Sequence, residues 1–315
     1  MFLFRKKKSD IILYAYDGLR PWGRSVVKAA RRLGIESRLF RESRDVPDKK
    51  SVFVFFDMMA QYRDDERKRL VSISADLAEK KNIFVVPKAH ERAYQFDKSL
   101  QAKLFSDWVP RTWYADSPAE ARRAISEIKF PLMSKSKLSI QSKNVRVIKN
   151  RESAEKEIHL AFAGDGIPCS DGALQKGYLL WQEFVKGDGF DWRIGIVAKK
   201  YAYIVKRFNR GNIPLASGSG FLEPVTELND DSKSLLDYVL AFAGKNDLTL
   251  AGVDVIDGAG GRRYVLESHC SWGIGLKSQK SRIFERVNGG WIPTKHTNSR
   301  IHHVVAKAIA DGDFS

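Results

Sequence analysis

Two carboxylates and a histidine in the last third of the chain are the residues best placed to do chemistry. The stretch from Leu250 to Gly275 predicts two short strands joined by the glycine-rich turn DGAGG. Because side chains alternate along a strand, Asp254 on the first strand and Glu267 and His269 on the second can converge on one face. Carboxylates that lie close together favour a hard cation between them, most commonly Mg²⁺ held with substrate phosphates. The pattern therefore predicts a magnesium and nucleotide site, with an exposed polar hairpin as the alternative.

The charge of the chain bears on what it binds. Its 315 residues include 54 Lys and Arg against 38 Asp and Glu, which gives a formal net charge of +16. A field of this sign concentrates polyanions such as nucleotides, nucleic acid or acidic peptides. Composition does not choose among these partners, and a basic protein whose charges are spread over solvated faces is the alternative.

Composition argues against several classes of protein. Hydrophobic residues make up 43% and aromatic residues 11% of the chain, which is too many for wholesale disorder. No run of about twenty apolar residues is present to span a bilayer, and MFLFRKKKSD has its charges on the wrong side of its apolar run for a secretory signal. Cys169 and Cys270 are far apart and give no zinc spacing. We expect a cytoplasmic protein of two or three domains.

The first part of the chain predicts an α/β domain. Strands alternate with helices up to about residue 88, which indicates parallel crossover units. Ligands of such sheets lie beyond the carboxyl ends of the strands, so the loop from Tyr16 to Gly23 is a candidate substrate site. Asp17 and Arg20 would act there, with a polar turn as the competing interpretation. The loop has no GxGxxG fingerprint, and a dinucleotide site is not supported.

Later segments predict antiparallel strands and capped helices. Ser117 and Glu120 predict a capping box at the start of a helix. Leu132 to Lys135 and Val145 to Ile148 predict two strands around a Ser- and Lys-rich loop that could fold over phosphates or form a solvated turn. An antiparallel meander is predicted from YLLWQEFV, DWRIGIV and KYAYIVKRF. Further helices are predicted over Asp64 to Lys80, Arg151 to Phe162, Ser232 to Lys245 and near His302 to Asp311.

In this serial order the elements resemble the ATP-grasp superfamily, closest to its ribosomal-protein-modifying and glutathione-synthetase-like carboxylate-amine ligases. The segments that carry the resemblance are FDKSLQAKLF, PLMSK, WQEFV, DWR, VDV and LESH. The resemblance implies an α/β fold, α+β overall, with an open parallel-sheet domain followed by two subdomains with antiparallel sheets. The implied boundaries are a pre-ATP-grasp domain at 1–90, a central subdomain at 91–175 and a carboxy-terminal subdomain with the metal-binding hairpin at 176–315.

The resemblance also implies roles for individual side chains. Arg193 and Arg207 would grip an acyl phosphate as catalytic residues, in a fork-like geometry that suits phosphate oxygens. Metal ligands would be Asp254, Glu267 and His269. Nucleotide contacts are implied for Lys98, Lys135, Ser139, Ser142, Gln182, Glu183, Phe184, Val185, Asp191 and Lys206.

The implied function is an ATP-dependent ligase that joins a carboxylate to an amine through an acyl phosphate, with ATP and Mg²⁺. Its substrates would be a small-molecule carboxylate and an amine, or an anionic partner such as nucleic acid or an acidic peptide, and no membrane is implied. An ATP-grasp phosphotransferase and a non-catalytic nucleotide- or nucleic-acid-binding protein are the alternatives. Two features depart from the family. Glu267-Ser268-His269 replaces Glu-x-Asn, which would favour Mn²⁺ or Zn²⁺, and SIQSKN lacks the glycines common in the phosphate loop.

Overall fold

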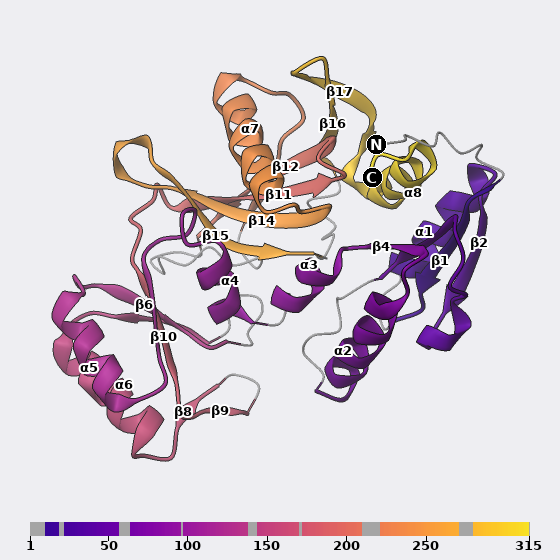
Figure 1. The fold of residues 1–315 in the computed structure, drawn as a ribbon. Coiled ribbons are helices and arrows are strands. Elements are labelled where there is room, and N and C mark those ends of the chain that lie inside the picture. Colours follow the sequence, from indigo (N-terminus) through magenta and orange to yellow (C-terminus); the bar gives the residue numbers. More distant parts are fainter. Residues whose placement is uncertain are drawn as a thin grey trace.

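The structure is a computed structural model that describes residues 10–18, 22–56, 64–95, 97–137, 144–169, 172–209, 221–270 and 280–314. Figure 1 shows three regions: a parallel sheet with its helices at one end, a small sheet covered by helices at the other, and a larger sheet between them. None of the helices within the described ranges is long and apolar enough to cross a membrane.

The amino-terminal region is the open α/β unit that the sequence predicts. Its elements are β1 (Ile12–Tyr16), α1 (Trp22–Arg32), β2 (Glu36–Phe40), a 3₁₀ turn (Ser43–Asp45), β3 (Val52–Phe55), α2 (Asp64–Glu79) and β4 (Ile83–Val86). The strands follow the order β2-β1-β3-β4, and every pairing is parallel. Side chains such as Leu13 and Val54 are fully buried, as expected for parallel strands with helices on their faces.

The central region is a four-stranded sheet with helices against it. Its elements are α3 (Ala89–Tyr94), α4 (Lys98–Leu104), β5 (Thr112–Ala115), α5 (Pro118–Glu127), β6 (Leu132–Lys135), β7 (Val145–Ile148), α6 (Arg151–Phe162), β8 (Ile167–Pro168), β9 (Leu174–Gln175) and β10 (Leu179–Glu183). The order β5-β10-β6-β7 is antiparallel throughout, and α5 and α6 share an apolar core with one face of the sheet. Ser117 caps α5, as predicted, by accepting a hydrogen bond from the N–H of Glu120. The predicted capping box is not completed, because the Glu120 carboxylate accepts from the N–H of Asp116 and not from that of Ser117.

The third region is a seven-stranded sheet. Its elements are β11 (Phe190–Val197), β12 (Tyr201–Phe208), β13 (Leu222–Pro224), α7 (Asp230–Lys245), β14 (Leu250–Asp257), a 3₁₀ turn (Ala259–Gly261), β15 (Arg263–His269), β16 (Arg282–Val287), β17 (Gly290–Thr297), a 3₁₀ turn (Asn298–Arg300) and α8 (Ile301–Asp311). The strand order is β15-β14-β11-β12-β16-β17, with β13 beside β12. One face packs on α7, and α8 shares a core with α1, so the last helix ties this sheet to the amino-terminal region.

The structure corrects the predicted meander. β10 lies in the central sheet between β5 and β6 and does not pair with β11, because the chain crosses to the other sheet after Glu183. The central sheet therefore ends with β10, and the large sheet begins with β11. The domain boundaries expected at residues 90 and 175 stay predictions. The sequence also misses the β16–β17 hairpin and the short β8–β9 pair.

Candidate functional site

The site is built around the hairpin of β14 and β15, which the sequence predicts correctly. Asp254 lies directly opposite Glu267, and Gly252 lies opposite His269. Opposed residues of an antiparallel pair project to the same side, so the two carboxylates and the imidazole share a face. The register then shifts at a β-bulge, where Leu266 is the extra residue.

Arginines from two neighbouring strands hold Asp254. Arg193 on β11 donates to both of its carboxylate oxygens, with Nη2 2.7 Å from Oδ2. Arg207 on β12 lies with Nη2 2.8 Å from the same Oδ2, and it also donates to Asp191 over 2.6 and 2.7 Å. Burial alone would raise the pKa of Asp254, but the charges of Arg193 and Arg207 outweigh it and lower that pKa. These four side chains form one largely buried ionic network.

Glu267 is held from α4 instead. Lys98 Nζ donates to Glu267 Oε1, and His269 Nε2 lies 3.2 Å from the same oxygen. The helix begins at Lys98 because Asp97 caps it, accepting from the N–H of Ser99 at 2.8 Å. Burial opposes ionisation of Glu267, but His269 and Lys98 outweigh it and hold its pKa well below the usual range. His269 Nδ1 is buried and has no hydrogen-bond partner among the described residues.

Gln101 fixes α4 against β15. It lies one helical turn after Lys98, on the same side of the helix. Its side-chain oxygen accepts a hydrogen bond of 3.0 Å from the backbone N–H of Ser268. Together with the pair between Lys98 and Glu267, this contact sets the position of the helix along the strand.

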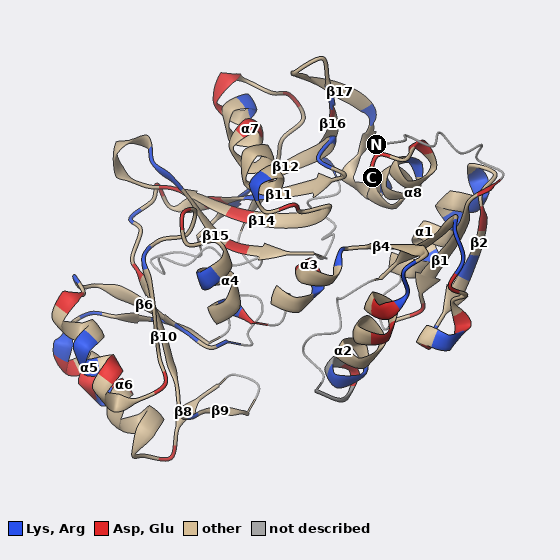
Figure 2. Ribbon diagram, in the orientation of Figure 1, with Lys and Arg blue, Asp and Glu red and all other residues tan. Residues whose placement is uncertain are grey.

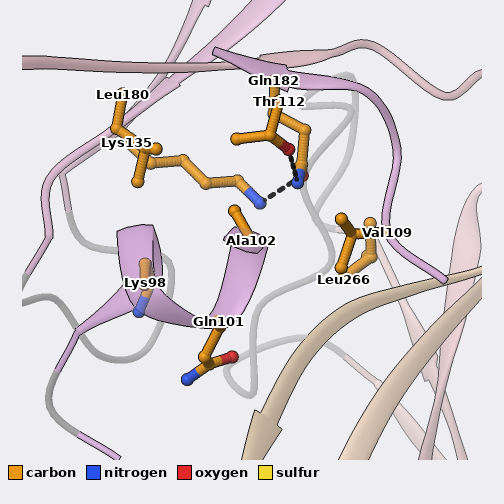
Figure 3. Close-up of a pocket in the computed structure, with 9 residues that line it drawn as sticks. All are labelled: Lys98, Gln101, Ala102, Val109, Thr112, Lys135, Leu180, Gln182 and Leu266. Atoms are coloured by element: carbon orange, nitrogen blue, oxygen red, sulfur yellow. Dashed lines mark hydrogen bonds between the residues drawn. The ribbon is translucent and has the colours of Figure 1, made fainter. Parts of the chain in front are cut away.

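A small pocket lies where α4, the four-stranded sheet and the hairpin meet (Figure 3). In Figure 3 the side chain of Lys135 extends toward Gln182, and Lys135 Nζ donates to Gln182 Oε1 at 2.6 Å. Gln182 Nε2 donates in turn to Thr112 Oγ1 at 2.9 Å. The sheet register produces this chain of contacts, because Thr112 lies opposite Gln182 and Leu180 opposite Lys135. The lining residues are Lys98, Gln101, Ala102, Val109, Thr112, Lys135, Leu180, Gln182 and Leu266.

The lining fits a nucleotide. Val109, Leu180 and Leu266 are apolar side chains that could face a planar base, and Lys98 and Lys135 carry ammonium groups that could bind phosphate. Burial lowers the pKa of Lys135 to about 8, because the charged ammonium loses solvation there. A bound phosphate would favour the charged form and so oppose this shift.

The two hairpin carboxylates, Asp254 and Glu267, are suitable ligands for a divalent cation. Mg²⁺ in nucleotide sites is usually held by one or two carboxylates together with substrate phosphates, and the opposed pair Asp254 and Glu267 supplies that donor set. Within the described ranges, however, no three His, Cys, Asp or Glu side chains gather closely enough to hold an ion. The expected three-residue cluster with His269 is not assembled, because Asp254 bonds to arginines and Glu267 to Lys98. A role for His269 as a ligand stays a prediction.

Lys206 is not brought to the pocket. It lies opposite Trp192, and so on the other face of β12 from its neighbour Arg207. Its Nζ sits 4.0 Å from the centroid of the Phe190 ring and also lies over Trp192. Lys206 therefore lies on the face of β12 opposite to Arg207, and its nucleotide contact stays a prediction.

The residues after Gln182 differ in placement. Glu183 is exposed, since it faces the side of β10 opposite to Gln182. Phe184 and Val185 follow the strand and are half-buried. Val185 lies beside the hairpin turn, where a Cβ added to Gly258 would be 3.1 Å from Val185 Cγ1. Three predicted site residues lie outside the described residues: Arg20, Ser139 and Ser142.

Sequence reasoning misses several residues that line the pocket. Gln101 carries a usable signal, because it follows Lys98 at helical spacing. Thr112 carries none, because its role depends on the pairing of β5 with β10. Leu266 reaches the pocket at the bulge, which alternation along a regular strand does not predict.

Comparisons with known proteins bear on the fold. No protein-family model matches the chain, and no curated protein matches it. Among solved structures, the ATP-grasp ligase PsnB complexed with minimal precursor, Mg and ADP has a TM-score of 0.60 at 16% identity, over 97% of this chain and 99% of that one. D-cycloserine synthetase DcsG has a TM-score of 0.63 at 15% identity, over 96% and 99%. Macrocyclase MdnC from Microcystis aeruginosa MRC, bound with precursor peptide MdnA, has a TM-score of 0.58 at 14% identity, over 96% and 99%. This chain therefore has the ATP-grasp fold.

Proposed function

We propose that this protein is an ATP-dependent ligase that forms a C–N bond and releases ADP and phosphate. The observation that carries the proposal is the opposed pair Asp254 and Glu267, held among Arg193, Arg207 and Lys98 beside the pocket. Enzymes that transfer phosphoryl groups use carboxylates to hold a cation and cationic side chains to bind the phosphate oxygens. The ATP-grasp fold supports the same function, since PsnB is solved with Mg and ADP.

Each side chain has a place in the proposed complex. Apolar side chains that include Leu180 and Leu266 would hold the base of ATP, and Lys98 and Lys135 would bind its phosphates. Asp254 and Glu267 would hold Mg²⁺, which supplies positive charge to the phosphate oxygens. Lys98, which here bonds to Glu267, then has a second anionic partner in the phosphate chain.

The chemistry proceeds in two transfers. A carboxylate oxygen of the substrate attacks the γ-phosphorus of ATP, and the bond between that phosphorus and the β,γ-bridging oxygen breaks. The products of this first transfer are ADP and an acyl phosphate. An amine then attacks the carbonyl carbon and loses a proton, and phosphate departs as the amide forms. Arg193 and Arg207 stabilise the negative charge of the acyl phosphate, while the enclosure of both reactants raises their effective concentration.

The substrate class that we propose is a peptide. PsnB is also solved with precursor peptide PsnA2 and MdnC with precursor peptide MdnA, and the net charge of +16 on this chain favours a partner rich in carboxylates. PsnB is solved with a minimal precursor and ADP and MdnC with a precursor peptide, and none of the names of the three neighbours mentions a nucleic acid.

An isotope experiment tests the reaction. The purified protein is incubated with ATP, Mg²⁺ and pools of acidic peptides and amines, in which the carboxylates carry ¹⁸O. A ligase releases ADP and phosphate only when both partners are present, and the phosphate carries one ¹⁸O from the carboxylate. ADP without free phosphate would indicate a phosphotransferase, and phosphate without ¹⁸O would exclude the acyl phosphate. The absence of ADP binding would refute the nucleotide site itself.

A further inference from the structure

A second charged cluster lies at the carboxyl end of the parallel sheet. Asp17 follows β1 directly, and its side chain is only 9% exposed. Arg24 Nε donates to its Oδ1 at 2.7 Å, and Arg41 donates to its Oδ2 from Nε at 3.1 Å and from Nη2 at 2.9 Å. The two arginine side chains are 63% and 65% exposed. One half-buried carboxylate thus holds two solvent-facing guanidinium groups side by side, and the three groups have a net charge of +1.

Both guanidinium groups have N–H donors that Asp17 does not use. Within the described part of the chain, Arg24 bonds only through Nε, and Nη1 of Arg41 has no hydrogen-bond partner. Two like charges held together repel each other, and a second anion on their open side relieves that repulsion. Carboxylate and phosphate oxygens match the forked donors of arginine.

The topology places this cluster where open α/β sheets bind ligands. The chain leaves β1 first toward β2 on one side and later returns to β3 on the other, so the strand order reverses at β1. The start of α1 also packs directly on the end of β1. A Cβ on Gly23 would lie 1.9 Å from the carbonyl oxygen of Tyr16, so only glycine permits this approach. The close contact fixes the helix that carries Arg24 against the strand that leads to Asp17.

Cys270 connects this edge with the proposed ligase site. It follows His269 at the end of β15, and it is buried in the same apolar cluster as Tyr16 and Phe56. Tyr16 immediately precedes Asp17 in the sequence. In Figure 1, β15 runs toward the amino-terminal region. The strand that carries Glu267 and His269 therefore ends in the same apolar cluster as Tyr16, the residue before Asp17.

We propose that Arg24 and Arg41, oriented by Asp17, bind a carboxylate group of the peptide substrate. The identity of the ligand rests on the proposed function, whereas the arginine pair itself does not. Asp17 is a positioning residue, because it acts through the two arginines. Phosphate shares the same chemistry, so the experiment must separate a peptide carboxylate from a phosphate.

The test measures binding of a defined probe, the peptide acetyl-Glu-Glu-Glu-amide, to the full chain by calorimetry at low salt. Arg24→Gln and Arg41→Gln should each weaken binding about tenfold, as the loss of a charge-assisted hydrogen bond predicts. Arg38→Gln is the matched control, because Arg38 is a 63% exposed arginine on the same sheet that pairs with Glu36. Equal affinities in all three variants would overturn the proposal.

Asp17→Asn separates positioning from simple attraction. It makes the protein more positive by one charge, so non-specific electrostatics predicts tighter binding of the acidic probe, whereas the positioning role predicts weaker binding. Inorganic phosphate is titrated in parallel, and tighter binding of phosphate than of the peptide at the arginine pair would overturn the carboxylate assignment. The neutral peptide acetyl-Gln-Gln-Gln-amide should not bind.

ADP affinity, measured on the same variants, keeps the two proposals apart. It should stay unchanged in Arg24→Gln and Arg41→Gln, since neither residue lines the nucleotide pocket. If neither the wild type nor any variant binds ADP, the proposed function is refuted. Even then, weaker peptide binding in these two variants alone would still support the arginine site. If Asp17→Asn does not fold, the two exposed arginine variants decide the question alone.

Discussion

Asp254 and Glu267 face each other across β14 and β15, yet each carboxylate bonds to a cation from a different part of the fold. Arg193 reaches Asp254 from the neighbouring strand β11, and Lys98 reaches Glu267 from the first turn of α4. Figure 2 shows acidic positions on both hairpin strands and a basic one on α4 nearby. The charge balance of the site therefore depends on how α4 is seated against the large sheet.

Removal of the Glu267 charge should uncouple nucleotide binding from magnesium. Glu267→Gln keeps the shape of the side chain but loses the carboxylate, and we expect the gain in ADP affinity on adding Mg²⁺ to fall by about tenfold or more. Calorimetry of ADP with and without Mg²⁺ measures this gain. Glu285→Gln is the control, because Glu285 lies on β16 and pairs with Lys200. An unchanged Mg²⁺ effect in Glu267→Gln would show that the assignment is wrong.

The lowered pKa of Lys135 should make ADP affinity fall at high pH. Its pKa of about 8 means that the ammonium loses its proton as the pH rises through that value. ADP affinity should therefore fall about tenfold between about pH 7 and about pH 9, since binding needs the charged form. Lys135→Arg keeps a charged side chain over this range and should flatten the profile. A wild-type profile that is already flat would rule out a phosphate contact by Lys135.

The lowered pKa of Lys135 also predicts how the free energy of unfolding depends on pH. The folded state lowers the pKa of Lys135 from 10.5 to about 8, so the unfolded chain binds this proton more tightly. The charged lysine disfavours folding below about pH 8, and the free energy of unfolding should rise as the pH increases from about 8 toward 10.5. Urea unfolding of wild type and Lys135→Met across this window measures the difference. A rise of the same size in both proteins would assign the effect to other groups.

Arg207 should matter more for stability than a surface lysine. It is 7% exposed and bridges Asp191 and Asp254, which are 2% and 6% exposed. Arg207→Gln leaves two buried carboxylates without their shared cation, and we expect a loss of about 3–5 kcal/mol in the free energy of unfolding.

A surface pair provides the control for that measurement. Lys245 bonds to Asp107, and both side chains are mostly exposed. Lys245→Gln should therefore change the urea midpoint too little to resolve. If Arg207→Gln shifts the midpoint no more than Lys245→Gln does, the buried network contributes no net stability.

Lys206 should be dispensable for nucleotide binding. It packs over Phe190 on the face of β12 opposite to Arg207. Lys206→Met keeps most of the apolar contact with that ring, and ADP affinity should stay within about twofold of wild type, since the lost cation–π contact lies away from the pocket. A large loss of ADP affinity, with the melting temperature unchanged, would place Lys206 in the site after all.

Much of the local structure follows from the sequence. The Ser117 cap, the helix Arg151–Phe162 and the β14–β15 hairpin are all present as predicted, because their signals lie within a few neighbouring residues. The alternation of side chains also predicts that Lys206 and Arg207 lie on opposite faces of β12, as the structure has them.

The site itself was decided by the tertiary structure. β10 joined β5 and β6 and brought Gln182 to Thr112 and Lys135, although these residues lie far apart in the chain. The pairing of Lys98 with Glu267 spans 169 residues, and that of Arg193 with Asp254 spans 61. Residue types and alternation determined which side chains could do chemistry, but the partner of each charge depends on packing between separate elements, which no local pattern encodes.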